Sequence, residues 1–480
     1  MSDVTEENSY RNILKRISAF GGVQMFSILI SLVRGKFVAM FLGPEGMGIS
    51  SLYTSASGSV QQLSSLGLNL ALVKETSSAN EDAGKLPHVI SAALRLITLT
   101  ALLGGILCVV LAPILSMWTF GSADYTPGFL LLSISVSLSI AGAGYLSLLQ
   151  GMGEVKRLAK ASLVGGLTGL LCGVPLYYFF GYKGIVPSMI ILSGATFLFY
   201  FLSFRRSIDI KPSTFNLNAH KPLVKRLLAT GIVLMIGSLS GTLTGYLINT
   251  FIRMAGSVED VGLFQSANSL TNQYVGLIFS ALSLDYFPRL AAAKDDLKKF
   301  NDIINRQIEI VSLIITPLLL ILIFTAPLVV RILLTDDFMS IVPLTRWLGL
   351  GIMIQAVAFP IGFVFIAQDN KRIYVWTEVV LTNILWLVCS VFFYYEFQLI
   401  GLGISLVVRS IIGDSISFII VSKCYKFRLS GYNAGLLVAM AVMVTAGFAA
   451  SYWEKYDYMI LIPLIVFSLI FSFVKLKRRL

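Results

Sequence analysis

Long apolar segments separated by short polar connections recur along the whole chain. Each has about 20 residues, the length that an α-helix needs to cross the roughly 30 Å hydrocarbon core of a bilayer. The pattern predicts about fourteen transmembrane helices, or twelve, because the connections at 181–183 and 396–399 are very short. The predicted spans are 17–42, 46–72, 88–112, 127–150, 158–180, 184–204, 226–250, 262–286, 303–330, 341–366, 374–395, 400–421, 431–451 and 458–474. We therefore expect an all-α integral membrane protein.

Composition supports a membrane protein and excludes a soluble one. Of the 480 residues, 56% are hydrophobic and 13% charged, and the mean hydropathy is +0.82, which no soluble domain of this length matches. The net charge of +12 is no sign of nucleic-acid binding, because 28 of the 37 Lys and Arg lie on one side of the predicted topology. The positive-inside rule then places both termini in the cytoplasm.

The N-terminus has the features of a first membrane helix and not of a cleaved signal peptide. It is acidic at Asp3, Glu6 and Glu7, and the apolar stretch that follows is too long and has no small-residue cleavage site. Neither the four cysteines nor the two histidines have the spacing of metal ligands. We expect no metal, no cofactor and no disulfide framework.

A polar stripe with one cation runs along the first predicted span. Gln24, Ser27, Ser31 and Arg34 are spaced 3, 4 and 3 residues apart, which places them on one helical face. A hydrated face that carries a permanent cation inside a membrane usually lines a pathway or a binding cavity; the alternative is a structural ion pair. Lys36 lies about 200° around the same helix from Arg34, nearer the surface, where a lysine can snorkel.

Other polar side chains gather in the second, seventh and eighth spans. Residues 50–65 include ten Ser, Thr or Gln, and seven of the nine residues in 265–273 are polar. Ser and Thr can bond to their own helix and allow close packing, but the amides of Gln61, Asn268 and Asn272 are costly to bury in lipid without partners. We expect these spans, with the first, to line a cavity.

Each remaining charge inside the membrane is expected to have a partner or a function, because a charge at the bilayer centre costs about 2.5–3.5 kcal/mol. Arg95 either binds substrate or snorkels, and Arg253 is an interfacial anchor or lies at the mouth of the cavity. Arg409 and Asp414 are about 140° apart on one helix, so each is expected to pair across helices. Asp414 and Glu378 are either structural partners or groups that couple transport to an ion.

Short matches at an offset near 215 residues indicate that the chain contains a parallel repeat. The sequence EGMG at 45–48 corresponds to EDVG at 259–262, and KR at 156–157 to KR at 371–372. We predict a six-helix lobe at 1–204, a cytoplasmic linker at 205–225, a second lobe at 226–421, and a helical pair with a basic tail at 422–480.

Two motifs resemble those of Wzx-type O-antigen and polysaccharide flippases of the MOP (multidrug/oligosaccharidyl-lipid/polysaccharide) exporter superfamily. They are LGPEGMG at 42–48, followed by a Ser-rich span, and DYFPRL at 285–290. The resemblance implies two six-helix lobes around a central cavity bordered by the first, second, seventh and eighth spans. It also implies alternating access, and export of an undecaprenyl-pyrophosphate-linked oligosaccharide from the cytoplasmic to the periplasmic leaflet of the inner membrane. A cation on the first helix is a feature of related flippases, and Arg34 matches its place.

The residue chemistry agrees with such a cargo. A guanidinium grips a pyrophosphate bidentately, sugar hydroxyls bond to amides and hydroxyls, and an inside-negative potential favours outward movement of anions by about 2.3 kcal/mol per charge per 100 mV. The predicted substrate-binding residues are Arg34, Lys36, Arg95, Arg253, Gln24, Ser31, Gln61, Asn268, Asn272 and Arg409, and the predicted ion-coupling residues are Asp414 and Glu378. The expected partners are the lipid-linked oligosaccharide, membrane lipids, an O-antigen polymerase and a chain-length regulator, with no nucleic acid.

Three other functions compete with this interpretation. A drug/cation antiporter of the same superfamily needs acidic groups in a membrane-embedded site, and spans 17–42 and 226–250 contain no Asp or Glu. A peptidoglycan-precursor flippase stays a possible function, because the extra pair at 431–474 makes fourteen spans, the number found in that class of flippase. A membrane scaffold explains neither the repeat nor the polar helices. An enzyme is not expected, since the sequence has no phosphate-binding loop, catalytic pair or loop long enough for an enzyme domain.

Overall fold

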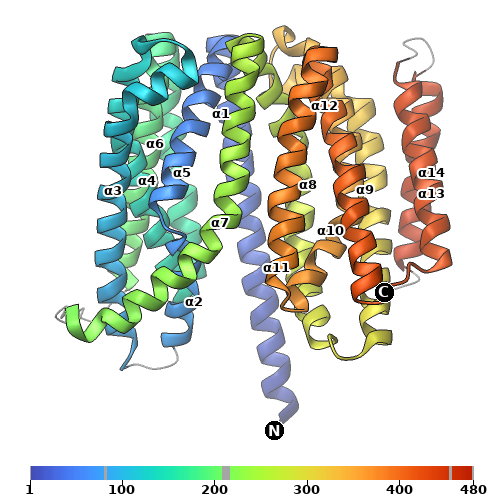
Figure 1. Cartoon of the computed structure of the whole chain (residues 1–480), viewed down its shortest axis with the longest axis horizontal. Coiled ribbons are helices and arrows are strands. Elements are labelled where there is room, and N and C mark those ends of the chain that lie inside the picture. Colours follow the sequence, from blue (N-terminus) through green and yellow to red (C-terminus); the bar gives the residue numbers. More distant parts are fainter. Residues whose placement is uncertain (1, 81–83, 208–216, 453–456, 478–480) are drawn as a thin grey trace. The chain divides into compact units, whose positions relative to one another are not determined.

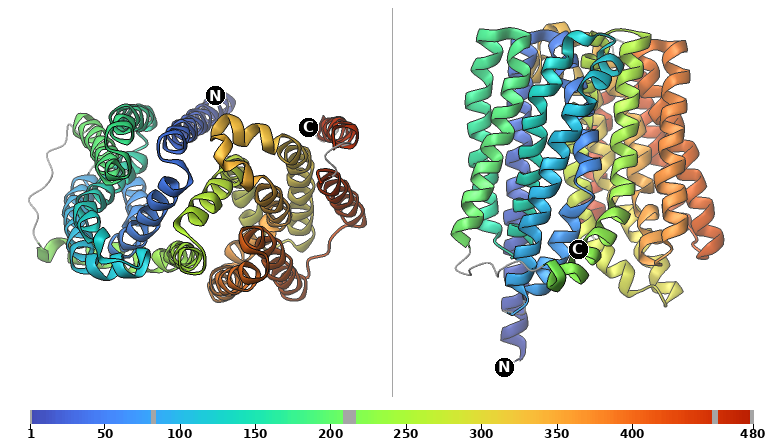
Figure 2. Two further views of the ribbon diagram at one scale, coloured as in Figure 1. Left: turned by 90° about the horizontal axis from the view of Figure 1, so that it is seen from above. Right: turned by 60° about the vertical axis from the view of Figure 1, so that its left-hand side comes forward.

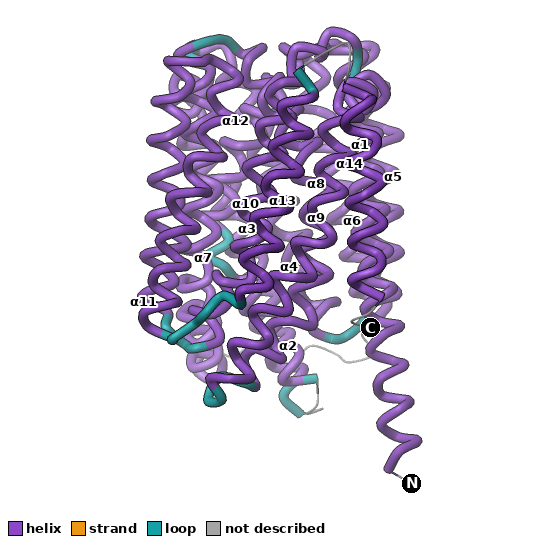
Figure 3. Tube along the Cα trace, turned by 90° about the vertical axis from the view of Figure 1, so that its right-hand side faces the viewer, coloured by secondary structure: helices purple, strands orange, loops and turns teal. Residues whose placement is uncertain are grey.

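The computed structural model describes residues 2–80, 84–207, 217–452 and 457–477, except for the side chains of 2–24, 217–220, 233, 273–275, 277–285 and 457–458. Throughout this described part the chain forms helices joined by short connections, with no strand (Figure 3). It divides into two compact units, Met1–Val261 and Gly262–Leu480. The expected all-helical fold is confirmed, and each unit is described below by itself.

Within its described residues, the first unit contains seven long helices and the first turn of an eighth (Figure 1). They are α1 (Ser2–Ser64), α2 (Leu68–Ala79), α3 (Leu86–Phe120), α4 (Thr126–Gly151), α5 (Val155–Phe180), α6 (Ile185–Ser207), α7 (Leu217–Ala255) and α8 (Val258–Ala292), with short 3₁₀ segments η1 (Ala123–Tyr125) and η2 (Gly181–Gly184). The second unit holds the rest of α8 and the following helices. These are α9 (Leu297–Leu333), η3 (Asp336–Ile341), α10 (Val342–Ala367), α11 (Lys371–Tyr374), η4 (Val375–Leu381), α12 (Thr382–Cys424), α13 (Gly431–Ala450) and α14 (Asp457–Lys477).

Glycine and a strained residue divide the longest helices. In α1, Gly43 has φ 64° and ψ −167° and is followed by Pro44; this conformation is open to glycine, and proline then restarts the helix at its first turn. In α12, Gln398 has φ 52°. The very short connections expected at 181–183 and 396–399 coincide with η2 and with Gln398, so the sequence located both breaks.

Ten helices in the described residues are long and apolar enough to cross a membrane. Three of these ten, Met25–Ser64, Val155–Ser207 and Lys371–Cys424, contain the breaks described above. The chain is therefore a multi-pass membrane protein. The count of fourteen crossings and the internal repeat stay predictions.

Small residues allow α5 and α6 to pack closely. Gly165, Gly169 and Gly173 lie four residues apart on α5, so they share one face. A Cβ at these positions would meet Thr196, Leu192 and Ser188 of α6. This is the small-xxx-small packing by which membrane helices approach each other without a hydrophobic driving force.

The start of α7 departs from the predicted linker at 205–225. The helix begins at Leu217, earlier than expected, and its first part is amphipathic: Leu223, Val224 and Leu227 pack on the core formed by α2, α3 and α4. In Figures 1 and 2 this part of α7, in light green, runs obliquely beside the ends of α2 and α3. The linker residues 208–216 lie outside the described residues.

Farther along, α7 packs against the second half of α1. The predicted span 46–72 ends early, at Ser64, because Gly67 takes a left-handed conformation with φ 65°. The backbones approach so closely there that a Cβ on Gly67 would overlap the carbonyl oxygen of Gly231, and one on Gly231 would overlap that of Leu66. This contact holds α7 against the turn between α1 and α2.

In the second unit, α13 and α14 form the helical pair expected near the C-terminus. Both pack on α9 (Figure 1, red beside yellow), through a core that includes Leu319 and Ile323 of α9, Met440 and Val444 of α13, and Leu461 of α14. The C-terminal end of α13 is held by Arg346 of α10, whose Nη1 donates to the carbonyl oxygen of Ser451 at 2.8 Å.

Candidate functional site

Arg34 lies in the first half of α1 and is half-buried. Ile30 contacts Gly166 of α5, and Phe41 packs edge-on against Tyr178 of α5 at 5.4 Å between ring centroids. Arg34 lies within about 40° of Ile30 around the helix, at the flank of this contact. It forms no hydrogen bond or ion pair anywhere in the described part of the chain. No described carboxylate therefore neutralises its charge.

The other predicted residues of the first helix are less informative. Ser31 and Lys36 are half-buried, and Lys36 has an interaction partner. The side chain of Gln24 lies outside the described residues. The polar stripe is thus helical as expected, and its lining of a cavity stays a prediction.

Polar contacts join the second half of α1 to α7. Gln62 Nε2 donates to Ser238 Oγ, and Gly58 faces Thr242 at 3.8 Å from the position of a Cβ. Gln61 is half-buried, and no hydrogen bond of its side chain is formed within the described residues. Gln62 therefore joins the two helices, and a role of the adjacent Gln61 in binding stays a prediction.

Arg253, at the end of α7, caps α3. Its Nε donates to the carbonyl oxygen of Thr119 at 2.9 Å and its Nη2 to that of Trp118 at 2.5 Å. A guanidinium there satisfies the last carbonyls of α3 and complements the negative end of its dipole. The structure thus shows an anchoring contact for Arg253, and its binding of substrate stays a prediction.

Arg95 lies on the outer face of α3. It is exposed, as are Leu99 and Leu102, four and seven residues farther along the same face. The buried side of the helix is formed by Ala92, Ala93 and Leu96. This position favours the snorkelling interpretation over the binding one.

In the second unit, Asn268 and Asn272 of α8 lie one turn apart. Asn272 Nδ2 donates to Asn268 Oδ1 at 2.5 Å, and Asn272 is exposed. The pair leaves further amide donors and acceptors for a polar ligand. The nearby motif DYFPRL begins at Asp285, whose side chain lies outside the described residues, while Tyr286 donates to the carbonyl oxygen of Pro360 at 2.9 Å.

The structure brings Arg409, Asp414 and Glu378 together. Arg409 lies within electrostatic range of both carboxylates, although no direct ion pair joins the three in the described residues. Glu378 Oε1 accepts from Ser417 Oγ at 2.7 Å, and the Arg409 guanidinium lies 5.7 Å from the ring centroid of Trp386. Arg409 and Asp414 are not a local salt bridge, as expected, but the expected ion pairs across helices are not formed in the described residues.

Two features of this charged cluster were missed from the sequence. Glu378 lies in η4, which is π-helical over Val375–Leu381; such widened turns occur frequently at functional sites. Asp414 also lines a cavity of about 520 Å³ between α9, α10, α12 and α13 whose other walls are almost entirely apolar. A π-turn and a cavity wall depend on neighbouring helices, so the local pattern of residues carries no signal for either.

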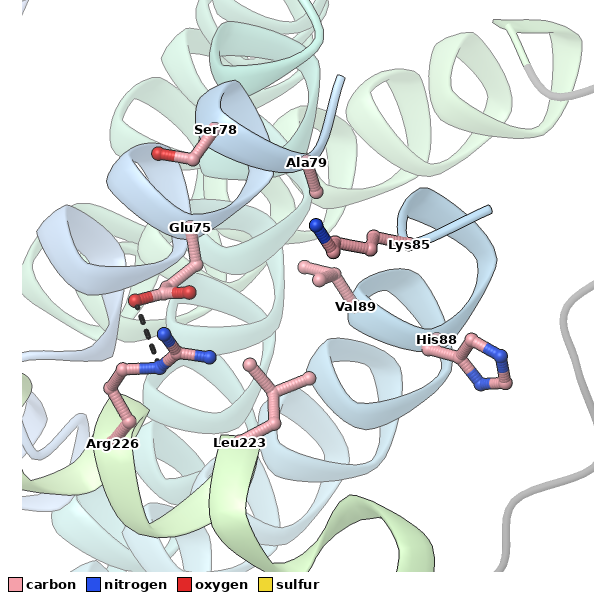
Figure 4. A pocket seen from close by; sticks show the side chains of 8 residues that line it. All are labelled: Glu75, Ser78, Ala79, Lys85, His88, Val89, Leu223 and Arg226. Carbon is pink, nitrogen blue, oxygen red and sulfur yellow. Dashed lines mark ion pairs between the residues drawn. The ribbon is translucent and has the colours of Figure 1, made fainter. Parts of the chain in front are cut away.

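A second cavity, of about 570 Å³, lies in the first unit (Figure 4). Glu75 of α2 pairs with Arg226 of α7 at 3.5 Å on one wall, and Lys85 and His88 come from the start of α3 on the other. The pair ties the amphipathic start of α7 to α2. The described residues contain no group of His, Cys, Asp and Glu that could hold a metal ion.

Known proteins are similar to this chain in sequence and in fold. A family described as "Polysaccharide biosynthesis protein" matches residues 37–343. The lipid III flippase of Escherichia coli strain K12 is 23% identical over 364 residues, which cover 72% of this chain and 83% of that protein. A Shigella flexneri protein named provisionally as an O-antigen transporter is 22% identical, over 65% of this chain and 74% of its own length.

Among solved structures, the lipid II flippase MurJ in an inward closed conformation has a TM-score of 0.71 at 15% identity, covering 95% of this chain and 99% of MurJ. An inward-facing multidrug transporter of the MATE family and MOP superfamily has a TM-score of 0.68 at 16% identity, covering 85% and 99%. The expectation of an MOP-superfamily fold is confirmed, while the two six-helix lobes around a central cavity stay a prediction. The chain belongs to the polysaccharide biosynthesis protein family, and its fold is that of the MOP-superfamily transporters.

Proposed function

We propose that this protein is a flippase that moves an undecaprenyl-pyrophosphate-linked oligosaccharide, the repeat unit of an O-antigen, from the cytoplasmic to the periplasmic leaflet by alternating access. The family and the names of its relatives support a saccharide-bearing lipid as cargo. The two termini face the cytoplasm of a bacterial inner membrane, in keeping with the asymmetric distribution of Lys and Arg.

One observation carries the proposal: Arg34, inside a membrane helix, has no counter-ion among the described residues. A permanent cation in this environment costs free energy unless a partner compensates it. A pyrophosphate supplies that partner, because its oxygens match the two parallel donors of a guanidinium. Ser31, Gln61, Asn268 and Asn272 are the hydroxyls and amides that we assign to the sugars.

The cargo class is tested by deleting the gene and restoring it. We expect the deletion strain to lose surface polysaccharide and to accumulate lipid-linked repeat units that stay inaccessible from the periplasm, and the restored gene to reverse both. The alternative cargo is a peptidoglycan precursor, which the similarity to MurJ keeps open at the level of the fold. Lysis and accumulation of a cell-wall precursor, with surface polysaccharide intact, would decide for that alternative.

An O-antigen polymerase and a chain-length regulator are the proposed partners on the periplasmic side.

We propose that Glu378, with Asp414, couples this transport to protons. Glu378→Gln keeps the shape of the side chain and an oxygen that accepts from Ser417 Oγ, but an amide does not titrate. In proteoliposomes at a fixed membrane potential, we expect a pH gradient to accelerate flipping by the wild type and to have no effect on the variant. Ser417→Ala is the control, since it removes the hydrogen bond and leaves the carboxyl group. An unchanged response to the gradient in Glu378→Gln would assign Glu378 a structural role only.

A further inference from the structure

A third cavity is lined by none of the residues assigned to the cargo. It measures about 790 Å³ and is formed in the second unit by the end of α8, the first turns of α9 and the start of α13. Its charged lining consists of Arg289, Lys299, Arg306, Asp302 and Glu309. Three cations and two carboxylates suit a ligand that carries both an anionic group and hydrogen-bond donors.

The wall of this cavity is fixed by a network centred on Asn305. Its Nδ2 donates to the carbonyl oxygen of Arg428 at 3.0 Å, and its Oδ1 accepts from the backbone N–H of Ser430 at 2.8 Å. Asn301 Oδ1 accepts from the N–H of Arg428 at 2.9 Å. The loop before α13 is therefore held against α9, and the cavity is a built feature of the unit.

Asn433 provides a buried acceptor in the same wall. It is 2% exposed, and its Nδ2 donates to the carbonyl oxygen and Oδ1 of Asn305 at 2.7 and 3.1 Å. Its own Oδ1 is buried without a hydrogen-bond donor in the described residues. A buried acceptor without a donor costs about 1–3 kcal/mol, so this oxygen favours a ligand that brings a hydroxyl or an N–H.

The surroundings of the cavity favour a lipid. Ser430 caps α13, and Tyr432, 44% exposed, stacks under Lys475 of α14 at 4.9 Å, a pairing of aromatic ring and cation typical of the membrane interface. Beyond it, α13 and α14 expose large apolar side chains, including Val438 and Phe473. A lipid head group in the cavity would leave its acyl chains against this apolar surface.

We propose that the cavity at the starts of α9 and α13 binds the head group of an anionic glycerophospholipid of the phosphatidylglycerol type. Lys299 and Arg306 contact its phosphate, with Arg289 adding positive charge. The hydroxyls of the head group donate to Asn433 Oδ1 and to the carboxylates of Asp302 and Glu309. Basic pockets of this kind between helix ends are suited to anionic lipids of the cytoplasmic leaflet. Because the lining has one more cation than carboxylates, it favours an anionic head group over a zwitterionic one.

The test compares the purified full-length protein in nanodiscs of phosphatidylethanolamine alone with nanodiscs that also contain phosphatidylglycerol. Native mass spectrometry counts retained lipids, and thermal denaturation reports stabilisation. We expect phosphatidylglycerol to bind and to raise the melting temperature of the wild type. The double variant Lys299→Ala/Arg306→Ala should bind it roughly tenfold to thirtyfold more weakly. Both side chains are exposed, so the variant should fold.

The matched control is Lys371→Ala/Arg372→Ala, which removes two exposed cations from the same unit outside the cavity. This control should keep the full effect of phosphatidylglycerol. Three results would each overturn the proposal: equal stabilisation by phosphatidylethanolamine, equal loss of binding in both double variants, or full stabilisation of the detergent-solubilised protein by glycerol 3-phosphate, which would identify a free phosphate as the ligand. None of these readouts depends on which cargo the protein moves.

Discussion

Arg34→Ala is expected to reduce export of the lipid-linked oligosaccharide by roughly tenfold to a hundredfold. A hydrogen bond to a charged group contributes about 1.5–3 kcal/mol, and about 1.4 kcal/mol corresponds to a factor of ten. Because no described residue neutralises Arg34, the variant removes the proposed interaction with the cargo and no ion pair with the described part of the protein. The measurement is the rate at which labelled lipid-linked oligosaccharide becomes accessible in the outer leaflet of proteoliposomes.

Two further variants serve as controls. One separates the charge of Arg34 from the geometry of its hydrogen-bond donors, and the other measures the effect of losing an arginine elsewhere. Arg34→Lys keeps the charge but loses the two parallel donors, so it should retain an intermediate rate. Arg331→Ala removes an arginine from an exposed pair with Asp336 at 2.8 Å, a type of contact that contributes little, and should transport normally. Wild-type rates in Arg34→Ala, at equal levels of inserted protein, would remove Arg34 from the transport pathway.

Gly231→Ala is expected to destabilise the protein by about 1–3 kcal/mol, as extra atoms do in a well-packed contact. The new methyl group would overlap the carbonyl oxygen of Leu66, and a backbone oxygen cannot move aside as the end of a side chain can. The loss should show as a lower melting temperature in detergent and a lower yield of folded protein. The paired variant Gly67→Ala should behave in the same way, with added strain from its φ of 65°.

Gly241→Ala is the control for this prediction, because it makes the same chemical change on the same helix. A Cβ at Gly241 would meet nothing within 4 Å, and alanine favours helix more than glycine does. This variant should be as stable as the wild type or slightly more stable. Equal melting temperatures for Gly231→Ala and Gly241→Ala would show that the contact between α7 and the turn after α1 is loose.

The structure also separates the intramembrane cations into different classes that the sequence left together. Arg253 donates to the last carbonyls of α3, Arg95 lies on an exposed apolar face, and Arg409 faces two carboxylates and Trp386. Arg95 and Lys36 also have interaction partners, and among these cations only Arg34 has none in the described residues. The case for a direct role in transport is therefore strongest for Arg34, which is also the residue that the sequence pattern singled out.

The sequence by itself determined the all-helical membrane fold, the breaks at Gly43, 181–183 and 396–399, the pair of helices near the C-terminus, and the family. These features are local: the length of an apolar run, the periodicity of a polar stripe, and a Gly-Pro turn each act on neighbouring residues, so they can be read along the chain.

Only the tertiary structure decided which charges have partners, which glycines lie at contacts, and where cavities form. The chain has 40 glycines, and nothing local distinguishes Gly231, which touches another backbone, from Gly241, which touches nothing within 4 Å. The same holds for Asn433 and Asn305, more than a hundred residues apart in sequence and joined by hydrogen bonds. Such contacts arise when helices distant in sequence pack together, because packing and hydrogen bonding depend on distances in space that no single segment specifies.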